Sequence, residues 1–132
     1  MYISHRILRL AVLTTVLGTL LVFSAAVVGQ KSTELFVPIG ESPGLSGVHT
    51  LIGRVQAVNP AARTLTVAAA AGARSVRLDD KTLVFIDRSK LRQLSTIGTL
   101  ADFRPRQNAE VKFRNNNAAA GIAEWVKVQP AS

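Results

Sequence analysis

The chain contains no cysteine, one methionine at position 1 and only two histidines. Without thiols it forms no disulfides and carries no lipid on a cysteine, so its stability has to come from packing. Zinc sites need several histidine or cysteine ligands, and His49 is the only such residue beyond the N-terminal segment. Soft Cu(I) needs thiolate or thioether ligands, which Met1 alone offers. We therefore expect no metal site and no cofactor.

Groups of residues that could act together in catalysis are equally scarce. Nucleophilic catalysis needs a nucleophile, a base and an orienting group. His49 could act as a base, but the sequence contains no nucleophile motif. Glycine-rich loops of the kind that cradle phosphates are missing. Asp79 and Asp80 are adjacent, so in an extended segment their side chains diverge and cannot share a proton; basic residues after them argue against a calcium loop. The sequence predicts no catalytic residues and no enzyme, with the two acids shaping a turn.

An uncharged apolar run from Leu10 to Val28 follows two arginines and includes small residues near its end. This order is typical of a bacterial secretion signal. The run is also nearly long enough to span a bilayer, so two alternatives remain open. Residues 1–29 are either a signal peptide, cleaved after Ala26 or Gly29, or a signal anchor held in the inner membrane by residues 10–28. Both alternatives place the rest of the chain in the periplasm or outside the cell.

The remainder has about a hundred residues, the common size of a single domain. From Gln30 on it keeps fourteen of the sixteen Lys and Arg residues and all eight Asp and Glu residues, for a net charge of +6. Such a balance favours weak attraction to anionic surfaces, although it is also common on soluble exported domains. Residues 30–48 lack periodicity and are rich in Pro and Gly, which predicts a linker or extended arm. We expect this arm to pack on its own domain; extension to a neighbour is the alternative.

Residues 49–129 alternate apolar and polar residues with a period of two, interrupted by turn residues. The alternation predicts short strands, over residues 51–58, 64–69, 74–78, 82–86, 110–114 and 122–128. Between residues 87 and 107 the pattern loosens, and we expect Ser89 and Thr99 to cap short helical turns there. Five to six strands with a short helical loop favour an all-β fold, a small closed or half-closed barrel.

The motifs that carry the clearest pattern are GRVQAVN at 53–59, LTV at 65–67, VRL at 76–78, LADFRP at 100–105, VKF at 111–113 and AEWVKV at 123–128. In these motifs the chain, from about Thr50 to Gln129, resembles small exported bacterial β-barrel domains of the OB-like kind, many of unknown function. The resemblance implies architecture and says almost nothing about chemistry. The chain departs from the pattern of these domains at Arg106, where they usually have a glycine after the proline.

Basic residues gather in the loop region from 88 to 106, against only Asp87 and Asp102. Loops beside the sheet commonly form the binding edge of an OB-like barrel, and arginine binds phosphate or carboxylate bidentately. The alternative is a solvated loop with weak surface ion pairs. Trp125 is out of phase with its apolar neighbours, so it is either a core residue, which we favour, or a contact residue. The predicted contact surface consists of Arg88, Lys90, Arg92, Arg104, Arg106, Lys112, Arg114 and Trp125.

These observations predict a non-enzymatic exported binding or accessory module of the bacterial cell envelope. The alternative is a binder of an anionic polymer, either nucleic acid or envelope polysaccharide, through the same basic loop face. The expected partner is accordingly an envelope protein of unknown identity or an anionic polymer. We expect no small-molecule cofactor, and membrane contact only through the N-terminal segment.

Overall fold

The computed structural model describes residues 33–131, so the predicted signal segment lies outside the described residues. From Leu35 on, the chain forms one compact unit. Its regular structure consists of strands and short 3-10 turns, which are η1 (Glu34–Phe36), β1 (Thr50–Asn59), β2 (Thr64–Ala69), β3 (Gly72–Arg77), β4 (Leu83–Ile86), η2 (Ser89–Leu91), β5 (Thr96–Ile97), η3 (Leu100–Asp102), β6 (Asn108–Phe113), η4 (Arg114–Asn116) and β7 (Ala123–Val128). No helix in this part of the chain combines the length and hydropathy needed to span a bilayer.

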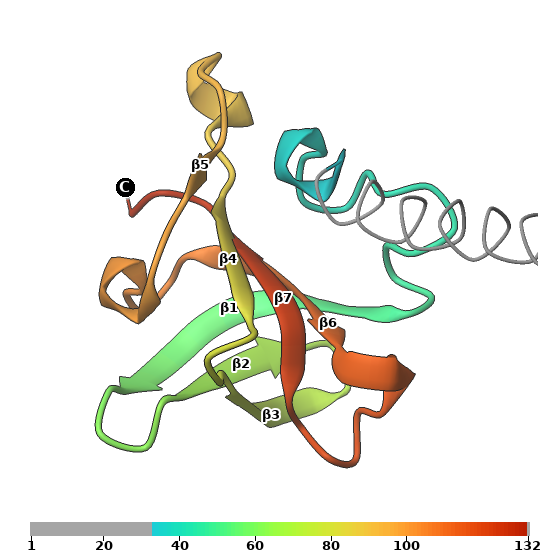
Figure 1. Cartoon of the computed structure of the whole chain (residues 1–132), viewed down its shortest axis with the longest axis vertical. Coiled ribbons are helices and arrows are strands. Elements are labelled where there is room, and N and C mark those ends of the chain that lie inside the picture. The colour runs from blue at the N-terminus through green and yellow to red at the C-terminus, as the bar shows by residue number, and fades with distance from the viewer. Residues whose placement is uncertain (1–32, 132) are drawn as a thin grey trace, which may run out of the picture. The chain divides into compact units, whose positions relative to one another are not determined.

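All strands belong to one mixed sheet with the order β3-β2-β1-β6-β7-β4-β5 (Figure 1). The first three strands form an antiparallel meander. β1 also pairs with β6, and β6 with β7, in antiparallel fashion, whereas β7 runs parallel to β4. The prediction of an all-β fold is confirmed. Residues 33–131 form seven strands, because the two-residue strand β5, inside the segment predicted as a helical loop, pairs with β4.

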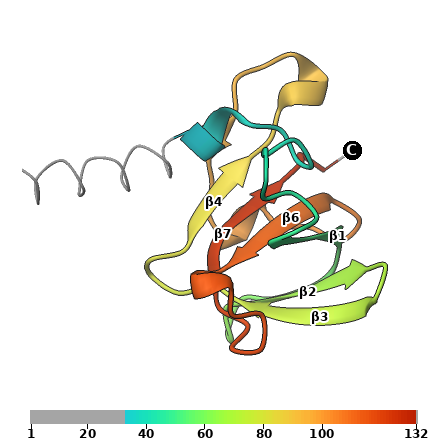
Figure 2. The same ribbon diagram turned by 90° about the vertical axis from the view of Figure 1, so that its right-hand side faces the viewer.

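The sheet curls but does not close into a barrel (Figure 2). Its β3 edge touches the segment before β7 through a single parallel bridge between Arg77 and Ile122. The amide of Arg77 donates to the carbonyl of Gly121 at 2.8 Å. Further pairing between β3 and β7 is blocked because β4 occupies that edge of β7 from Trp125 to Val128. Of the two predicted forms of the barrel, the closed one is therefore wrong, and the sheet stays open at this edge.

The curl depends on β1, which changes its partner along its length. Its first half pairs with β6 and its second half with β2, with a register shift between Val55 and Ala57. Such a bulge bends a strand and increases its twist. At the crossover, a Cβ on Gly53 would lie 2.3 Å from the carbonyl oxygen of Ala68. Glycine is required at this position because the two backbones approach too closely for a side chain.

The main core lies against one face of the curled sheet. Its buried members are Val55, Leu65, Val67, Val76, Leu78, Val84, Phe103, Ala109, Val111, Phe113, Ala123, Val126 and Val128. Phe103 follows η3, whose N-terminus is capped by Thr99 and Asp102 in a reciprocal capping box, as predicted for Thr99. The predicted cap at Ser89 is wrong. Ser89 begins η2 without a side-chain cap, and its amide donates to the carboxylate of Asp87.

Residues 38–50 pack on the outer face of the sheet of their own chain. Three hydrogen bonds reach the carboxylate of Glu110 on β6, from the amide of Gly40 and the hydroxyls of Ser46 and Thr50. The amide of Ile39 donates to Asp87 at 2.9 Å. This segment therefore covers polar side chains that project from β6 and from the end of β4.

Candidate ligand-binding cleft

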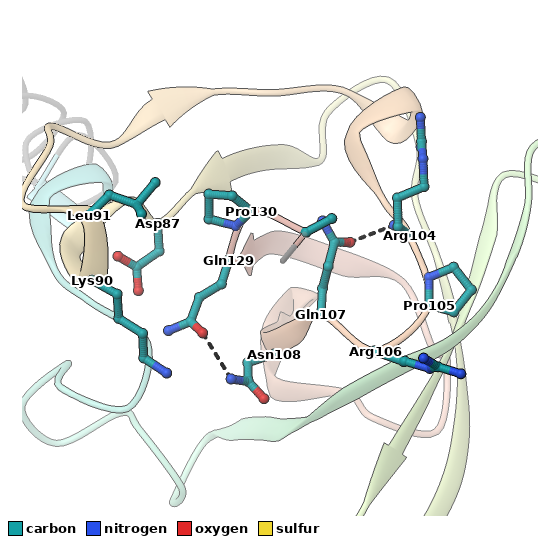
Figure 3. A pocket seen from close by; sticks show the side chains of 11 residues that line it. Asp87, Lys90, Leu91, Arg104, Pro105, Arg106, Gln107, Asn108, Gln129 and Pro130 are labelled. Carbon is teal, nitrogen blue, oxygen red and sulfur yellow. Dashed lines mark hydrogen bonds between the residues drawn. The ribbon is translucent and has the colours of Figure 1, made fainter.

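A cleft of about 720 Å³ opens where β4, β6 and β7 have their ends on one side of the sheet (Figure 3). It lies between the η2 turn, the turn at residues 104–107 and the last described residues of the chain. Its lining consists of Asp87, Lys90, Leu91, Arg104, Pro105, Arg106, Gln107, Asn108, Gln129, Pro130 and Ala131.

The pairing of the strands brings the polar side chains of the cleft together. Asn108 begins β6 and Gln129 follows β7; their backbones are hydrogen-bonded at 3.0 Å and their side-chain amides at 2.9 Å. Asp87 follows β4, and its amide donates to the carbonyl of Val128 at 2.8 Å. Three segments far apart in the sequence thus place a carboxylate and two amides at one edge.

Asp87 is held in its ionised form. Burial favours the neutral acid, but hydrogen bonds from the amides of Ile39 and Ser89 and from the side chains of Ser89 and Gln129 outweigh it and lower the pKa of Asp87. Its two carboxylate oxygens accept from the arm and from the η2 turn at 2.9 Å each. The carboxylate is therefore committed to holding these two segments together.

The opposite wall is a tight turn built around Gln107. The buried side chain of Gln107 accepts from the amide of Arg104 and donates to the carbonyl of Asp102. The amide of Arg106 donates to the carbonyl of Val55 at 2.7 Å, which anchors the turn to β1. Arg106 adopts a φ of +76° to do so. The tight turn thus forms with arginine in a left-handed conformation that glycine adopts more easily.

Three of the predicted contact residues, Lys90, Arg104 and Arg106, line this cleft. Figure 3 shows Lys90 extending toward the side where Asn108 and Gln129 lie. The guanidinium of Arg104 turns the other way and donates to the carbonyls of Ala101 and Phe103 at 2.6 and 2.7 Å. The cations therefore surround the cleft and do not converge on one point. This arrangement suits an extended anionic segment better than one small anion.

Two further predicted residues, Arg88 and Arg92, belong to the adjacent η2 turn and do not line the cleft. The Nε of Arg88 donates to the side chain of Gln93 at 2.9 Å. Arg92 has a φ of +55° and is exposed. The basic loop is thus divided into residues that surround the cleft and residues that form the tip of the η2 turn.

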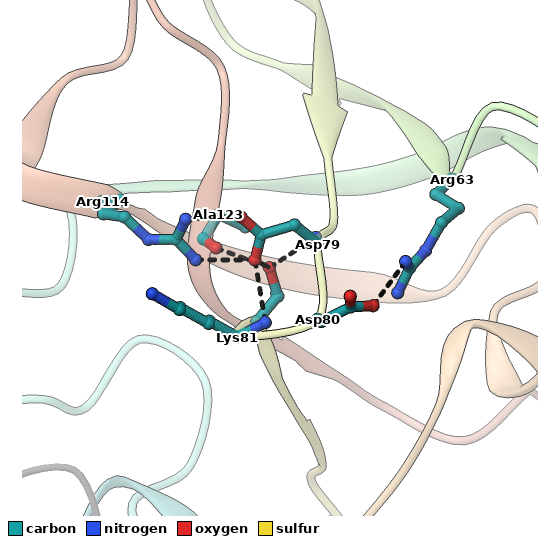
Figure 4. Close-up of polar contacts among 7 residues, drawn as sticks. Arg63, Asp79, Asp80, Lys81, Arg114 and Ala123 are labelled. Carbon is teal, nitrogen blue, oxygen red and sulfur yellow. Dashed lines mark hydrogen bonds and ion pairs between the residues drawn. The ribbon is translucent and has the colours of Figure 1, made fainter.

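Lys112 and Arg114 do not join this surface. Lys112 pairs with Glu124 at 2.7 Å. Arg114 follows the far end of β6, about 20 Å along the strand from Asn108 at ~3.3 Å per residue, and binds the carboxylate of Asp79 with both terminal nitrogens (Figure 4). The structure therefore pairs both cations with acids and does not bring them together with the cations of the cleft.

The two adjacent acids Asp79 and Asp80 diverge, as expected for a turn. Asp80 pairs with Arg63 at 2.7 Å, whereas Asp79 binds Arg114 and caps the turn through Lys81 and Thr82 (Figure 4). The Arg114 guanidinium, together with these hydrogen bonds, holds the pKa of Asp79 well below its usual range. The acids therefore stabilise separate connections of the fold.

Trp125 is a core residue and not a contact residue. It is 2% exposed. Its ring lies 6.5 Å from that of Phe85, and the ammonium of Lys127 stands 4.8 Å from its centre. Both faces of β7 are covered, so the out-of-phase position of Trp125 reflects a second buried face and not a solvent-facing one. Trp125 is removed from the contact surface.

Two residues that line the cleft, and one on the strand beside it, were not predicted from the sequence. Asn108 and Gln129 are ordinary polar residues, and only the pairing of β6 with β7 makes them neighbours. Arg54 on β1 is exposed and stands directly across from Asn108 in the β1–β6 register. Nothing local in the sequence related Arg54 to the loop at residues 104–107.

Within residues 33–131, no group of three or more His, Cys, Asp or Glu side chains is arranged to hold a metal ion. Comparisons with known protein families, curated proteins and solved structures found no match to this chain. The geometry of the cleft is therefore the basis for assigning a function to this chain.

Proposed function

We propose that this chain is a non-enzymatic binding module of the bacterial cell envelope, which holds an extended acidic segment of a partner protein in the cleft. The observation that carries the proposal is the placement of Lys90, Arg104 and Arg106 around a cleft whose one lining acid, Asp87, is committed to internal hydrogen bonds. Cations arranged around an open cleft favour several separate carboxylates over a single buried charge.

The conformation of Arg106 supports the same proposal. A non-glycine residue in the left-handed region costs roughly 1–2 kcal/mol, and Arg106 has a φ of +76°. Strained residues of this kind cluster at functional sites, where the side chain is needed in spite of its cost. A charged residue here, where glycine would relieve the strain, fits a role in binding.

The second candidate is a binder of an anionic polymer, and a specific observation favours it. Arg54 extends the basic surface from the cleft onto β1, where it stands across from Asn108. A strip of cations that continues beyond a cleft fits a chain of phosphates or sulfates. The described residues offer no exposed tryptophan or tyrosine on this strip for base stacking, which weighs against single-stranded nucleic acid.

Export and the OB-like relationship belong to the same proposal. Export rests on residues 1–29, which lie outside the described residues. The OB-like relationship is supported by the strand connectivity, a three-stranded meander followed by the β6–β7 pair with one parallel bridge back to β3, because OB folds are partly open five-stranded barrels. In this view β4 and β5 are additions at the β7 edge.

The first test uses the full chain in detergent and monitors side-chain amide signals by NMR during titration with a glutamate-rich peptide. Asn108 and Gln129 report on the cleft, and Asn115 and Asn117, in the β6–β7 connection, serve as the internal control. We expect saturable shifts at the cleft amides alone, and their loss in Arg104→Gln/Arg106→Gln. Equal shifts at both sets of amides would refute the cleft as the binding site.

The second test separates the two candidates. The chain and a variant with Arg88, Arg92, Arg104 and Arg106 changed to Ala are used for pull-down from envelope extract at low and high salt. A discrete protein that the chain captures at low salt and the variant does not capture supports the binding module, whose exposed charge contacts are themselves weakened by salt. Capture of an anionic polymer that is lost with salt and in the variant supports the second candidate, because phosphate contacts release counterions.

A further inference from the structure

The loop at residues 88–97, which follows β4 and contains η2 and the two-residue strand β5, exposes large apolar side chains. Leu94 is 79% exposed, Ile97 63% and Leu91 53%. The loop projects beyond the sheet, at the upper end of Figures 1 and 2. Exposed apolar side chains grouped in one projecting loop mark a surface that binds something less polar than water.

Hydrogen bonds hold the backbone of this loop in place, so the fold itself keeps its apolar side chains exposed. The amides of Leu91 and Gln93 both donate to the carbonyl of Arg88, and the amide of Gly98 donates to Val84 at 2.9 Å. The side chains of Arg88 and Gln93 are also hydrogen-bonded. These bonds fix a turn that directs its leucines outward before any partner is present.

The charges of the loop are all of one sign. Residues 88–98 contain Arg88, Lys90 and Arg92 but no Asp or Glu, and no aromatic residue. The absence of aromatic rings argues against a nucleic-acid base as the partner. Leucine is under-represented among the residues that dominate protein interfaces. Apolar side chains between basic ones are instead typical of segments that bind an anionic membrane surface.

We infer that the loop at residues 88–97 docks on an anionic phospholipid bilayer, with Leu91 and Leu94 entering the boundary between headgroups and acyl chains. Arg88 and Arg92 bind the lipid phosphates, since three cations without a carboxylate complement a negatively charged leaflet. Leu91 and Lys90 also line the cleft, whereas Leu94, Arg88 and Arg92 do not, so the last three residues test the membrane contact separately from the proposed function. The docked loop adds a second membrane contact to any made by the N-terminal segment.

The absence of cysteine allows a direct test on the full chain. A single cysteine introduced as Leu94→Cys is labelled with an environment-sensitive fluorophore, and the protein is reconstituted into vesicles of phosphatidylglycerol and phosphatidylcholine. Ala119→Cys, in the β6–β7 connection at the opposite end of β7, is the matched control. We expect a blue shift and quenching by nitroxide lipids at position 94, and an aqueous spectrum at position 119.

Lipid charge and loop charge provide the second arm of the test. The signal at position 94 should fall in vesicles of phosphatidylcholine alone and in Arg88→Gln/Arg92→Gln, a change that leaves the cleft cation Lys90 in place. An aqueous spectrum at position 94 in anionic vesicles overturns the inference. So do equal shifts at positions 94 and 119, or a shift that is independent of phosphatidylglycerol. Peptide binding at the cleft is measured on the same double variant, so that failure of the two proposals can be distinguished.

Discussion

Glu110 on β6 and Lys127 on β7 stand directly opposite each other, and both are buried, at 0% and 1% exposure. The segment at residues 38–50 covers them. It donates three hydrogen bonds to Glu110, at 2.6–2.8 Å, and Ser42 accepts one from Lys127 at 3.1 Å. Burial of charged groups is costly unless they are hydrogen-bonded. The arm before β1 is therefore a structural part of the domain.

Glu110→Gln should destabilise the fold by about 1–3 kcal/mol, because the amide cannot accept all three hydrogen bonds and leaves a buried donor without a partner. Chemical denaturation of the full chain measures the change. Hydrogen exchange at the amide of Gly40, which donates to Glu110, should become faster in the same variant.

Glu124→Gln is the matched control. Glu124 forms an ion pair with Lys112 that is more accessible than Glu110, and we expect a loss of less than about 1 kcal/mol. Equal losses in the two variants would contradict a special role of Glu110 in holding the arm.

Asp87→Asn should reduce the dependence of stability on acid pH. The pKa of Asp87 is lowered from its ordinary value of 3.8, so its contribution is complete above that value and is lost as the pH falls through the lowered folded value. Thermal unfolding at neutral pH and at about pH 3 measures it. Wild type should lose more Tm on acidification than Asp87→Asn, which starts lower. Equal losses of Tm would show that Asp87 is not the source of the acid sensitivity. Other acids, such as Asp79, would then be its source.

Arg106→Gly should stabilise the fold and weaken binding. Glycine relieves the positive φ, and after its larger unfolded-state entropy is subtracted we expect a gain of about 0.5–1 kcal/mol. Loss of the guanidinium should lower the affinity for the glutamate-rich peptide. Denaturation and NMR titration measure the two effects.

Arg106→Ala separates strain from charge, since it removes the guanidinium and keeps a Cβ at φ +76°. It should bind as weakly as Arg106→Gly without the gain in stability. Unchanged peptide affinity in both variants would remove Arg106 from the binding site.

Gly53→Ala should destabilise the sheet by about 1–3 kcal/mol, because the new methyl group would overlap the backbone of β2 at Ala68. Chemical denaturation is again the measurement. Ser75→Ala, on the exposed part of β3, is a control that should change stability by less than about 0.5 kcal/mol. A neutral Gly53→Ala would mean that β1 and β2 separate there at little cost.

Local pattern was sufficient for most strands and for one cap. Alternation located β1, β2, β3, β4, β6 and β7 to within a few residues, and the side chains of Thr99 and Asp102 define their own capping box. Both signals act over a few residues, so they can be read without the fold. The two-residue strand β5 is too short to show an alternation. It forms because the preceding loop returns the chain to the edge of β4.

The candidate site was predicted only in part. Lys90, Arg104 and Arg106 were identified by charge, and the structure places them around one cleft. Lys112 and Arg114 have the same charge but are paired with acids on other segments. Asn108 and Gln129 carry no charge to attract attention. Charge shows which residues are able to bind an anion, while strand pairing decides which of them are neighbours and unpaired.

The amino-acid sequence by itself determined the strand-rich class, the absence of thiol chemistry and the excess of positive charge, because composition and short-range periodicity act without tertiary contacts. Only the tertiary structure decided that Glu110, Lys127 and Trp125 are buried, that β4 keeps the sheet from closing, and that the basic loop divides between a cleft and an exposed apolar tip. The reason is physical: a period of two marks the two faces of a strand, but the segment that covers each face comes from elsewhere in the chain.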